Sequence, residues 1–585
     1  MKRFNPFESL RNLKAKVPKT IEKIESNEQI STSIVMESHI QTFIDCNSTN
    51  SIRSNSSSLL LVKLDRNESL CLHGVVQIAP IIGSFQMLGF KATGNIHDLS
   101  PSTKFYNVYS SLSSSLVTVS STQNVDIQNR DLESVNPELI EEIRLLLKQW
   151  DTLDLFTVIA LQPTSCGILG IERIHPIFKA CFKPTPTTKK NVLVPGSYFV
   201  GSEDIHLFPY TSYSNENLNV IGQVIKDANV ICVIGNTNTG KSTTTRYLTN
   251  ELLQNHREVA YLDCDLGQPE FTPCGMLSLT VVKEPLLGPP FTHFKIPYHG
   301  IYIGTVTPKA DPDSYITALF QLVDMYRNNL SHMPLIVNTS GWTKGVGFDL
   351  LIHFLTYVNP TAILSMQHFD GYPIDLSSSE TLLSVTHTLQ IPQSDTMSSK
   401  LHAADHRSLT TSSYFMLESI SINPTWDFKV TFSEQQPYRV DFSSIKIKFL
   451  NDSLPFSESL IALNGMIVGL VIDSTTYHSN QTQKSPHWGF IPSHTPLQQN
   501  CVGQGLIRSI DLQEKYFYIC TPVPLQTLCK VNLLVRGTIE VPIGLLTHGH
   551  GIRPQVPYTT FMQAGGVGAV ELRNRRLGRK KHQVN

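Results

Sequence analysis

A glycine-rich loop that ends in lysine and serine constrains the fold of this chain more than any other feature. An apolar run, Val230–Ile234, leads into the loop, and a helical pattern, Ser242–Leu253, leads out of it. The loop fits G-x4-G-K-[ST], a pattern typical of phosphate-binding loops. Its residues are Gly235, Asn236, Thr237, Asn238, Thr239, Gly240, Lys241 and Ser242, with Thr243 next on the helix. Because such a loop joins a strand to a helix in a parallel sheet, the chain is expected to contain an α/β unit.

These residue types suit a nucleoside triphosphate. Glycines let the backbone approach phosphate oxygens, and the following helix directs its positive end at the anion. Lys241 supplies a charge for the β- and γ-phosphates, and Ser242 can bind the Mg²⁺ that bridges them. The alternative is an ordinary glycine turn between strand and helix. A guanine-reading pattern is incomplete at Thr343–Val346, which lacks its final Asp, so ATP is favoured and other nucleotides stay open.

Two acids follow the next expected strand. Asp263 and Asp265 come directly after the apolar run Val259–Leu262. In a doubly wound sheet this strand ends at the same edge as the phosphate-binding loop, and alternation directs both carboxylates to one side. One carboxylate can hold Mg²⁺ or its water molecules, and the other can accept a proton from an attacking hydroxyl group. The alternative is an acidic strand end capped by a turn.

Length and patterning divide the chain into parts. At about 150 residues per domain, the 585 residues predict three or four domains. We expect a disordered basic N-terminus at 1–30, a β-rich domain at 31–205, a P-loop domain with a lid at 217–413, a second β-rich domain at 414–572 and a basic tail at 573–585. The fold class is therefore α/β, with a mainly parallel central sheet and flanking β-rich domains.

Local patterns predict individual elements. The central part has strand patterns at 230–234, 259–262, 335–337 and 362–366 and helix patterns at 242–253, 313–328 and 348–357. The flanking parts have strand patterns at 59–62, 74–78, 84–90, 429–432 and 445–449 and one helix pattern at 137–150. Two serine-rich stretches, 47–58 and 110–121, predict loops or exposed edges.

Composition excludes several classes of protein. Apolar residues make up 41% of the chain, which rules out a wholly disordered protein. Lys and Arg number 47 and Asp and Glu 48, so any nucleic-acid contact must come from local patches. The basic tail, 573–585, indicates a nuclear address or loose attachment to RNA. No apolar run reaches the roughly 18 residues of a membrane helix, so we expect no membrane contact.

Four segments resemble the polynucleotide 5′-hydroxyl kinases. They are the loop Gly235–Ser242, the acidic turn Tyr261–Phe271, the proline-rich segment Gly304–Pro312 and the segment Asn338–Gly345. Within that family the chain is most similar to the nucleolar branch that acts on pre-ribosomal RNA, rather than to the messenger-RNA cleavage-factor branch. The likeness extends over most of residues 55–580.

The resemblance implies an activity and a setting. The family transfers the γ-phosphate of ATP to a 5′-hydroxyl end of RNA, and its nucleolar branch acts on precursors cut within an internal transcribed spacer, bound to a HEPN-type endonuclease. It implies a nuclear, nucleolar protein that uses ATP and Mg²⁺. By motif position, Lys241 and Ser242 form the Walker A pair, Asp265 is the base for the 5′-hydroxyl, and Gln268 lies near the metal and the RNA end. We expect Ser242 and Asp263 to hold Mg²⁺.

Two further residues are candidates for the reacting end. Trp342 follows a glycine at a strand end, and in the family an aromatic residue at this place clasps the substrate; alternatively, it is a core residue that closes the sheet edge. The polar segment Ser394–Tyr414 resembles the family's arginine-bearing lid, in which Arg407 would clamp the transferring phosphate; alternatively, it is a solvated loop. Related lids often carry a second arginine, whereas this one offers lysine and histidine.

The sequence leaves three functions open. The first is an active 5′-hydroxyl kinase. The second is a scaffold in an RNA-processing complex, which binds nucleotide for stability without turning it over. The third is a motor or switch NTPase unrelated to RNA ends. Intact Lys241, Ser242 and Asp265 favour the first, because a retired site has no chemical need for all three.

Overall fold

The structure, a computed structural model, describes fourteen ranges of the chain. They are 42–46, 50–54, 58–94, 104–122, 137–150, 157–183, 191–207, 213–368, 374–377, 379–391, 401–450, 459–474, 490–491 and 499–547. The chain from Ile40 onward forms one compact unit. The expected N-terminus at 1–30 and the basic tail at 573–585 lie outside the described residues, and the predicted domain boundaries stay predictions.

The central sheet holds seven strands within these ranges, in the order β13-β12-β11-β14-β10-β15-β16. They are β10 (Val230–Gly235), β11 (Val259–Asp263), β12 (Met276–Val282), β13 (His299–Tyr302), β14 (Leu335–Asn338), β15 (Ala362–His368) and β16 (Thr386–Ile391). The pairs among β11, β14, β10, β15 and β16 are parallel, whereas β12 forms antiparallel pairs with β11 and β13. All four strands predicted for this part are confirmed.

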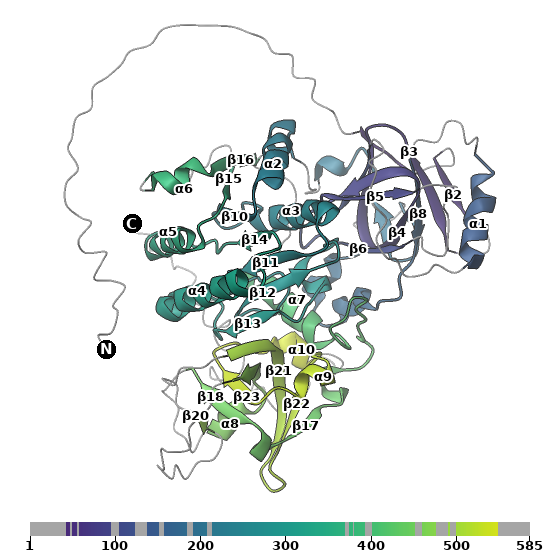
Figure 1. Ribbon diagram of the computed structural model, residues 1–585. Helices are drawn as coiled ribbons and strands as arrows, with labels where there is room; N and C mark the ends of the chain where they lie inside the picture. The colour runs from purple at the N-terminus through teal and green to yellow at the C-terminus, as the bar shows by residue number, and fades with distance from the viewer. Residues whose placement is uncertain are drawn as a thin grey trace, which may run out of the picture. The chain divides into compact units, whose positions relative to one another are not determined.

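Helices cover both faces of this sheet (Figure 1). The covering helices are α2 (Asn215–Asp227) and α3 (Lys241–Asn255) on one face and α4 (Pro312–Asn329) and α5 (Val346–Val358) on the other. Along β10, Ile231 and Val233 pack with α2 and α3, while Cys232 and Ile234 pack with α4 and α5. Burial on both faces explains why the strand is a continuous apolar run. The three predicted helices of this part are confirmed.

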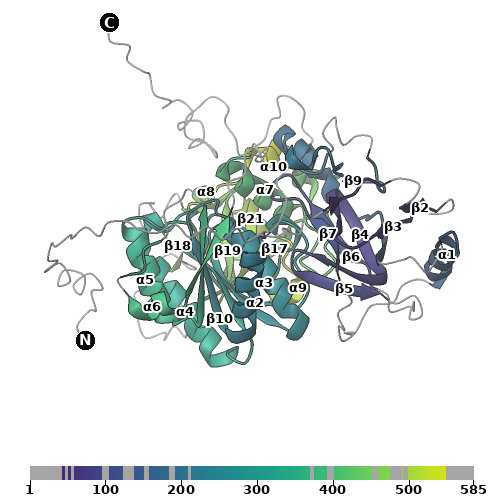
Figure 2. The same cartoon turned by 90° about the horizontal axis from the view of Figure 1, so that it is seen from above.

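Helix α3 is buried on nearly all sides. It contacts central strands on one side and β5 (Phe90–Gly94) of another sheet on the other (Figure 1, Figure 2). The side-chain amide of Asn250 donates hydrogen bonds to the carbonyls of Leu88 and Leu286 at 2.8 and 3.0 Å. Because both sides are covered, the polar residues of α3 find protein partners and form no solvent-facing stripe.

A second sheet is built around one long strand. Its strands in the described residues are β1 (Thr42–Phe43), β2 (Ser51–Arg53), β3 (Leu60–Leu64), β4 (Glu68–Met87), β5, β6 (Tyr106–Ser110), β7 (Thr118–Thr122), β8 (Thr157–Gln162) and β9 (Ser197–Phe199). Helix α1 (Pro137–Leu147), which confirms the predicted helix, packs on β3 and β8. Strand β7 pairs with both ends of β4, so the sheet curls upon itself.

Two sequence predictions in this sheet are confirmed only in part. The strands predicted at 74–78 and 84–90 are present, but they belong to one strand that runs through Pro80. The register against β8 shifts between Pro80 and Ile82, and this bulge accommodates the proline. The chain turns only at Leu88 and Gly89, where φ is 47° and 79°. The serine-rich stretch 110–121 is no exposed loop, because Ser110 is buried and its hydroxyl donates to the carbonyl of Leu72.

A third sheet contacts the β13 edge of the central sheet through β21. Its strands in this part of the structure are β17 (Tyr438–Asp441), β18 (Lys446–Phe449), β19 (Ile467–Asp473), β20 (Phe490–Ile491), β21 (Gln499–Asp511), β22 (Tyr516–Cys520) and β23 (Leu533–Arg536). The remaining helices are α6 (Glu380–Ser384), α7 (Ala403–Phe415), α8 (Ser459–Leu463), α9 (Leu525–Leu528) and α10 (Ile543–Thr547). The strand predicted at 445–449 is confirmed, whereas the one at 429–432 is wrong, because Thr431 and Glu434 form a capping box that starts a short 3₁₀ helix there.

The expected lid is largely a packed helix. Within 401–415, α7 begins after a capping box between His402 and Asp405, and its last two turns enter the core. The hydroxyl of Ser413 donates to the carbonyl of Phe291 at 2.7 Å, and Tyr414 is 1% exposed. The alternative of a solvated loop does not hold for 403–415, which form a helix with buried residues in its last two turns. The expected lid function of this segment stays a prediction.

At the coarse level, the prediction of an α/β chain with a P-loop between strand and helix is confirmed. Among the helices that the structure describes, none combines the length and apolar character that crossing a bilayer requires.

Substitutions at two glycines, one in a crowded position and one in an open position, test the packing of the fold. Gly304 has φ of 68°, and a Cβ there would lie 2.7 Å from Gly537 Cα, whereas a Cβ on Gly222 in α2 would meet nothing within 4 Å. We expect Gly304→Ala to destabilise the fold by more than about 1 kcal/mol through strain and overlap. Gly222→Ala should stabilise it by about 0.5–1 kcal/mol, since alanine loses less backbone entropy in a helix. Thermal unfolding of both variants measures the difference; unfolding temperatures that shift in the same direction would contradict this packing.

Candidate active site

Parallel pairing brings the key segments to one edge of the central sheet. Val233 of β10 and Asp263 of β11 both pair with Asn338 of β14, so the segments that follow these strands begin at the same level. Strand β13 runs in the same direction as β11, and the carbonyl of Val306 beyond it lies against Gly267 of the acidic turn. All four segments that carry the family resemblance therefore meet here.

The P-loop closes around its own lysine. The Nζ atom of Lys241 donates to the carbonyls of Gly235 and Asn236 at 2.8 and 2.7 Å. Burial lowers the pKa of Lys241 to about 8, although the nearby Asp265 carboxylate favours the charged form. Phosphate oxygens would be stronger acceptors for this ammonium than two carbonyls. The buried lysine therefore fits a bound triphosphate.

The backbone of the loop is shaped as a cradle. Asn238 and Gly240 have φ of 63° and 84°, the left-handed conformations that turn successive N–H groups toward a common centre. A Cβ on Gly235 would lie 2.6 Å from the hydroxyl of Thr239, so glycine is required. Ser242 lies half-buried on the first turn of α3, where the helix directs its positive end. The predicted nucleotide-binding residues thus form one site whose shape suits ATP with Mg²⁺.

Asp265 is held with one oxygen fixed. Its Oδ1 accepts hydrogen bonds from the N–H groups of Gly267 and Gln268 at 2.8 and 3.2 Å. Among the contacts of the described residues, its Oδ2 makes none, and the side chain is half-buried. Gln268 is exposed beside it. This geometry leaves a carboxylate oxygen, close enough to Lys241 to act on its pKa, free to receive a hydroxyl proton.

Asp263 is fully buried and braces the turn. It accepts hydrogen bonds from the N–H of Glu270 at 2.5 Å, the N–H of Asp265 at 3.2 Å and the side-chain amide of Asn338 at 3.3 Å. Burial raises the pKa of Asp263 well above its usual range. To touch a metal ion directly, the carboxylate would have to leave these partners. Its expected role as a Mg²⁺ ligand stays a prediction, and the geometry favours a bracing role.

A buried ionic cluster supports the acidic turn from behind, and the sequence analysis missed it. The Oε1 atom of Glu270 contacts Arg246 Nε of α3 at 2.7 Å and His293 Nε2 at 2.8 Å. Burial alone would raise the pKa of Glu270, but Arg246 and His293 hold it below its usual value. One sequence signal could have indicated this cluster. Arg246 lies on the helix that follows the P-loop, and a charged residue on a buried helix needs a partner of opposite charge.

Trp342 lies beside the P-loop. The loop that carries it is joined to Asn236 by a hydrogen bond from Thr343. The indole is half-buried, packs on Gly347, and has the Lys309 ammonium 5.5 Å from its ring centre. Both interpretations of Trp342, stacking platform and core residue, are compatible with this position.

Arg407 lies on the second turn of α7. Burial raises the pKa of Cys274, and the positive charge of Arg407 opposes this rise. Arg407 is therefore within electrostatic reach of Cys274, which follows the acidic turn. Its expected contact with phosphate stays a prediction. Lys400, which precedes α7, lies outside the described residues.

The fold and this edge define a P-loop nucleotide-binding protein of the kinase type. The family model for the P-loop of the mRNA cleavage and polyadenylation factor CLP1 matches residues 235–416, and the model for the NOL9-like C-terminal domain matches residues 433–542. A polynucleotide 5′-hydroxyl-kinase NOL9 of Arabidopsis thaliana is 32% identical over 338 residues, which cover 54% of this chain and 87% of that protein.

Other relatives match over greater lengths. The polynucleotide 5′-hydroxyl-kinase nol9 of Dictyostelium discoideum is 27% identical, with 86% of this chain and 83% of that protein covered. The human protein of that name is also 27% identical, with 86% and 77% covered. A chain of the solved wild-type Clp1p–Pcf11p complex is 14% identical, with 83% of this chain and 99% of that one covered at a TM-score of 0.49. The chain belongs to the NOL9-type polynucleotide 5′-hydroxyl-kinase family.

Breaking the buried cluster and breaking a surface ion pair should lower the free energy of unfolding by different amounts. Glu270→Gln leaves the Arg246 guanidinium, 7% exposed, without a counter-ion, which should cost about 3–5 kcal/mol of unfolding free energy. Glu258→Gln breaks the pair with Lys283, whose side chain is 64% exposed, and should cost less than about 1 kcal/mol. Because the folded-state pKa of Glu270 is depressed, its contribution is complete at pH 7 and disappears in acid. Urea denaturation at pH 7 measures both variants, and equal losses would contradict the structural role of the cluster.

Proposed function

We propose that this protein transfers the γ-phosphate of ATP to the 5′-hydroxyl end of RNA. The observation that supports this most strongly is the arrangement of Asp265, which has one oxygen fixed by backbone N–H groups and one left over, within electrostatic reach of Lys241. A kinase needs a charge on the leaving phosphates and a base for the acceptor hydroxyl. The relatives are named polynucleotide 5′-hydroxyl-kinases, which agrees with this reaction.

Each group in the site has a role in this reaction. The loop 235–240, Lys241 and Thr243 bind and orient the triphosphate, while Ser242 is placed to hold Mg²⁺, which when bound neutralises phosphate charge. Asp265 accepts the proton of the 5′-hydroxyl group as the hydroxyl oxygen attacks the γ-phosphorus. The bond from that phosphorus to the bridging oxygen of the β-phosphate breaks, and ADP leaves. Asp263 fixes the acidic turn and would contact Mg²⁺ through water molecules. Most of the rate enhancement then comes from positioning and charge neutralisation.

The acceptor end would lie against three residues. Gln268 is exposed next to Asp265, and Trp342 offers a ring on the segment after β14, which lies between β11 and β10 in the sheet. A base stacked on this indole would be held without regard to sequence. Arg407 approaches from α7 and would clamp the phosphate during transfer.

The setting that we propose follows the nucleolar relatives. The protein would act in the nucleolus on pre-ribosomal RNA whose internal spacer has been cut to leave a 5′-hydroxyl, together with a HEPN-type endonuclease. The central, mainly parallel sheet would be the kinase domain, and the two β-rich sheets would be flanking domains. A nucleotide-stabilised scaffold is the competing outcome.

Substitution of the two central groups tests the proposal. We expect Asp265→Asn to lower kcat/KM for transfer to a 5′-hydroxyl RNA by about 10²–10⁴-fold, the contribution of a general base, while ATP binding persists. Lys241→Ala should abolish both transfer and binding. Lys283→Ala, on an exposed lysine far from the loop in sequence, serves as the control and should retain full activity. Wild-type protein that binds ATP yet transfers nothing would favour the scaffold.

Trp342→Ala separates stacking from core packing. Loss of one stacked base should raise KM for the RNA by about 5–150-fold, equivalent to about 1–3 kcal/mol, with KM for ATP unchanged. Trp342→Phe should recover most of the loss. The measurement is steady-state transfer with each substrate varied in turn, alongside thermal unfolding. A lower unfolding temperature with an unchanged KM for RNA would instead identify Trp342 as a core residue.

A further inference from the structure

A polar cavity of about 660 Å³ lies away from the P-loop edge. Its walls come from β4, β6 and β8 of the sheet built on β4, from residues 284–295 after β12, and from residues 421–424. The volume is within the range that holds small ligands in proteins. None of the groups argued to act in catalysis lines it.

One wall carries a row of side-chain amides across three adjacent strands. Gln162 Nε2 donates to Gln77 Oε1 at 2.8 Å, and Gln77 Nε2 donates to Asn107 Oδ1 at 3.0 Å. The strand register sets the row, because Gln77 of β4 pairs directly with both neighbours. In the described contacts, the row ends in an unused acceptor on Gln162 and an unused donor on Asn107. Amides of this kind form paired hydrogen bonds with the edges of nucleobases.

The cavity also carries positive charge. Lys104, which precedes β6, forms an ion pair with Glu284 at 3.0 Å, and both side chains are partly exposed and line the cavity. Lys295 lines the cavity too, and no described hydrogen bond or ion pair engages its ammonium. Burial lowers the pKa of Lys295, and Glu284 opposes that effect only in part. Two lysines against one glutamate leave the cavity suited to a phosphate group.

The remaining features also suit a nucleotide. Ile422 lines the cavity and is 72% exposed, so it offers an apolar surface for the face of a base. His293, which also lines the cavity, contacts Glu270, and the N–H of Glu270 donates to Asp263. An occupant would therefore be linked to the acidic turn through two residues.

We propose that this cavity binds one nucleotide unit, with its phosphate at Lys295 and Lys104 and its base edge against the amide row. The unit has two possible sources, a free mononucleotide or a nucleotide within the bound RNA strand. The second source rests on the proposed function, and the first does not.

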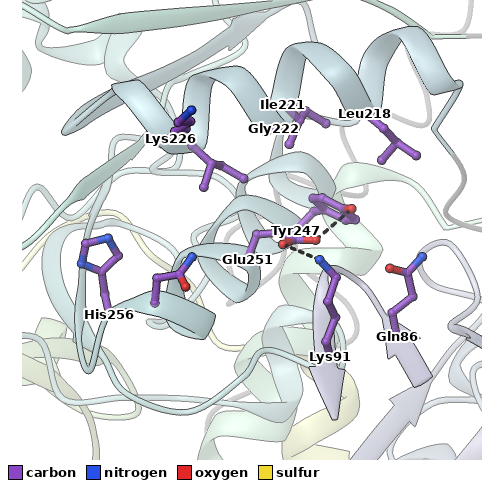
Figure 3. Close-up of a pocket in the computed structure, with 11 residues that line it drawn as sticks. Gln86, Lys91, Leu218, Ile221, Gly222, Lys226, Tyr247, Glu251 and His256 are labelled. Carbon is purple, nitrogen blue, oxygen red and sulfur yellow. Dashed lines mark hydrogen bonds and ion pairs between the residues drawn. The ribbon is translucent and has the colours of Figure 1, made fainter. Parts of the chain in front are cut away.

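A second cavity supplies a matched control (Figure 3). It has a volume of about 610 Å³ and contains the ion pair between Lys91 and Glu251 at 3.2 Å. Lys91 and Lys104 have nearly equal side-chain exposure, 28% and 27%. The wall formed by α2 holds Leu218, Ile221 and Lys226, so this cavity also has two lysines beside one glutamate, but it has no amide row. Lys91→Gln therefore removes a comparable ion pair without touching the proposed site.

The test measures binding alone. Full-length protein saturated with ATP and Mg²⁺ is titrated with uridine 5′-monophosphate and, separately, with a single-stranded RNA that carries a 5′-phosphate and so cannot accept transfer. Calorimetry follows the first probe and fluorescence anisotropy the second. Because the 5′ end of each probe already carries a phosphate, neither probe can accept another one from ATP. The binding results can therefore be interpreted even if the kinase proposal fails.

We expect Lys295→Gln and Lys104→Gln to weaken binding at least about tenfold, since a hydrogen bond to a charged group is lost, while Lys91→Gln stays within about twofold. For the RNA probe, the salt slope should fall by about 0.7 per lost phosphate contact. Lys295→Arg keeps the positive charge and should retain binding. Retained binding would show that the loss in Lys295→Gln comes from the missing charge and not from disruption of the fold. Weakening for the mononucleotide identifies a free ligand, and weakening for RNA alone identifies a strand contact. Equal effects of Lys295→Gln and Lys91→Gln, or no binding of either probe to the wild type, would overturn the proposal.

Discussion

The parallel pairing of β14 with both β10 and β11 sets the position of every group at the site. Because Val233 and Asp263 share Asn338 as their neighbour, the P-loop and the acidic turn leave the sheet at the same level. A slip of one residue would reverse the direction of the side chains on β11 and remove the Asp263 carboxylate from its donors. The reaction that we propose therefore depends first on strand register and only then on the identity of the catalytic side chains.

A network of buried polar groups stabilises this edge. Asp263 accepts hydrogen bonds from two N–H groups and an amide, and the Oε1 atom of Glu270 contacts an arginine and a histidine. Burying these charges is unfavourable unless each finds a partner, so the network fixes one arrangement of the turn and disfavours others. The result is a carboxylate, Asp265, that is already oriented before any substrate arrives. Such preorganisation is how phosphoryl-transfer sites avoid reorganisation during the reaction.

Much of this arrangement could be predicted from the sequence because its signals are local. Short sequence patterns predict the loop 235–242 and also the strand and the helix that flank it. The predictions failed where contacts distant in sequence decide the structure. Ser110 and Ser413 appear in serine-rich stretches that suggest exposure, yet partners far along the chain bury their hydroxyls. The roles of Glu270 and Arg246 depend on a contact between a turn and a helix, and nothing in either segment alone predicts their pairing.

The central claim is that a triphosphate and a free 5′-hydroxyl end are held in line across the carboxyl edge of one sheet. The most direct measurement incubates the purified full-length protein with γ-labelled ATP, Mg²⁺ and two RNA oligonucleotides that differ only in a 5′-hydroxyl or a 5′-phosphate. We predict that label appears on the strand with a 5′-hydroxyl and not on the strand with a 5′-phosphate. Label on neither strand, from protein shown to hold ATP, would contradict it.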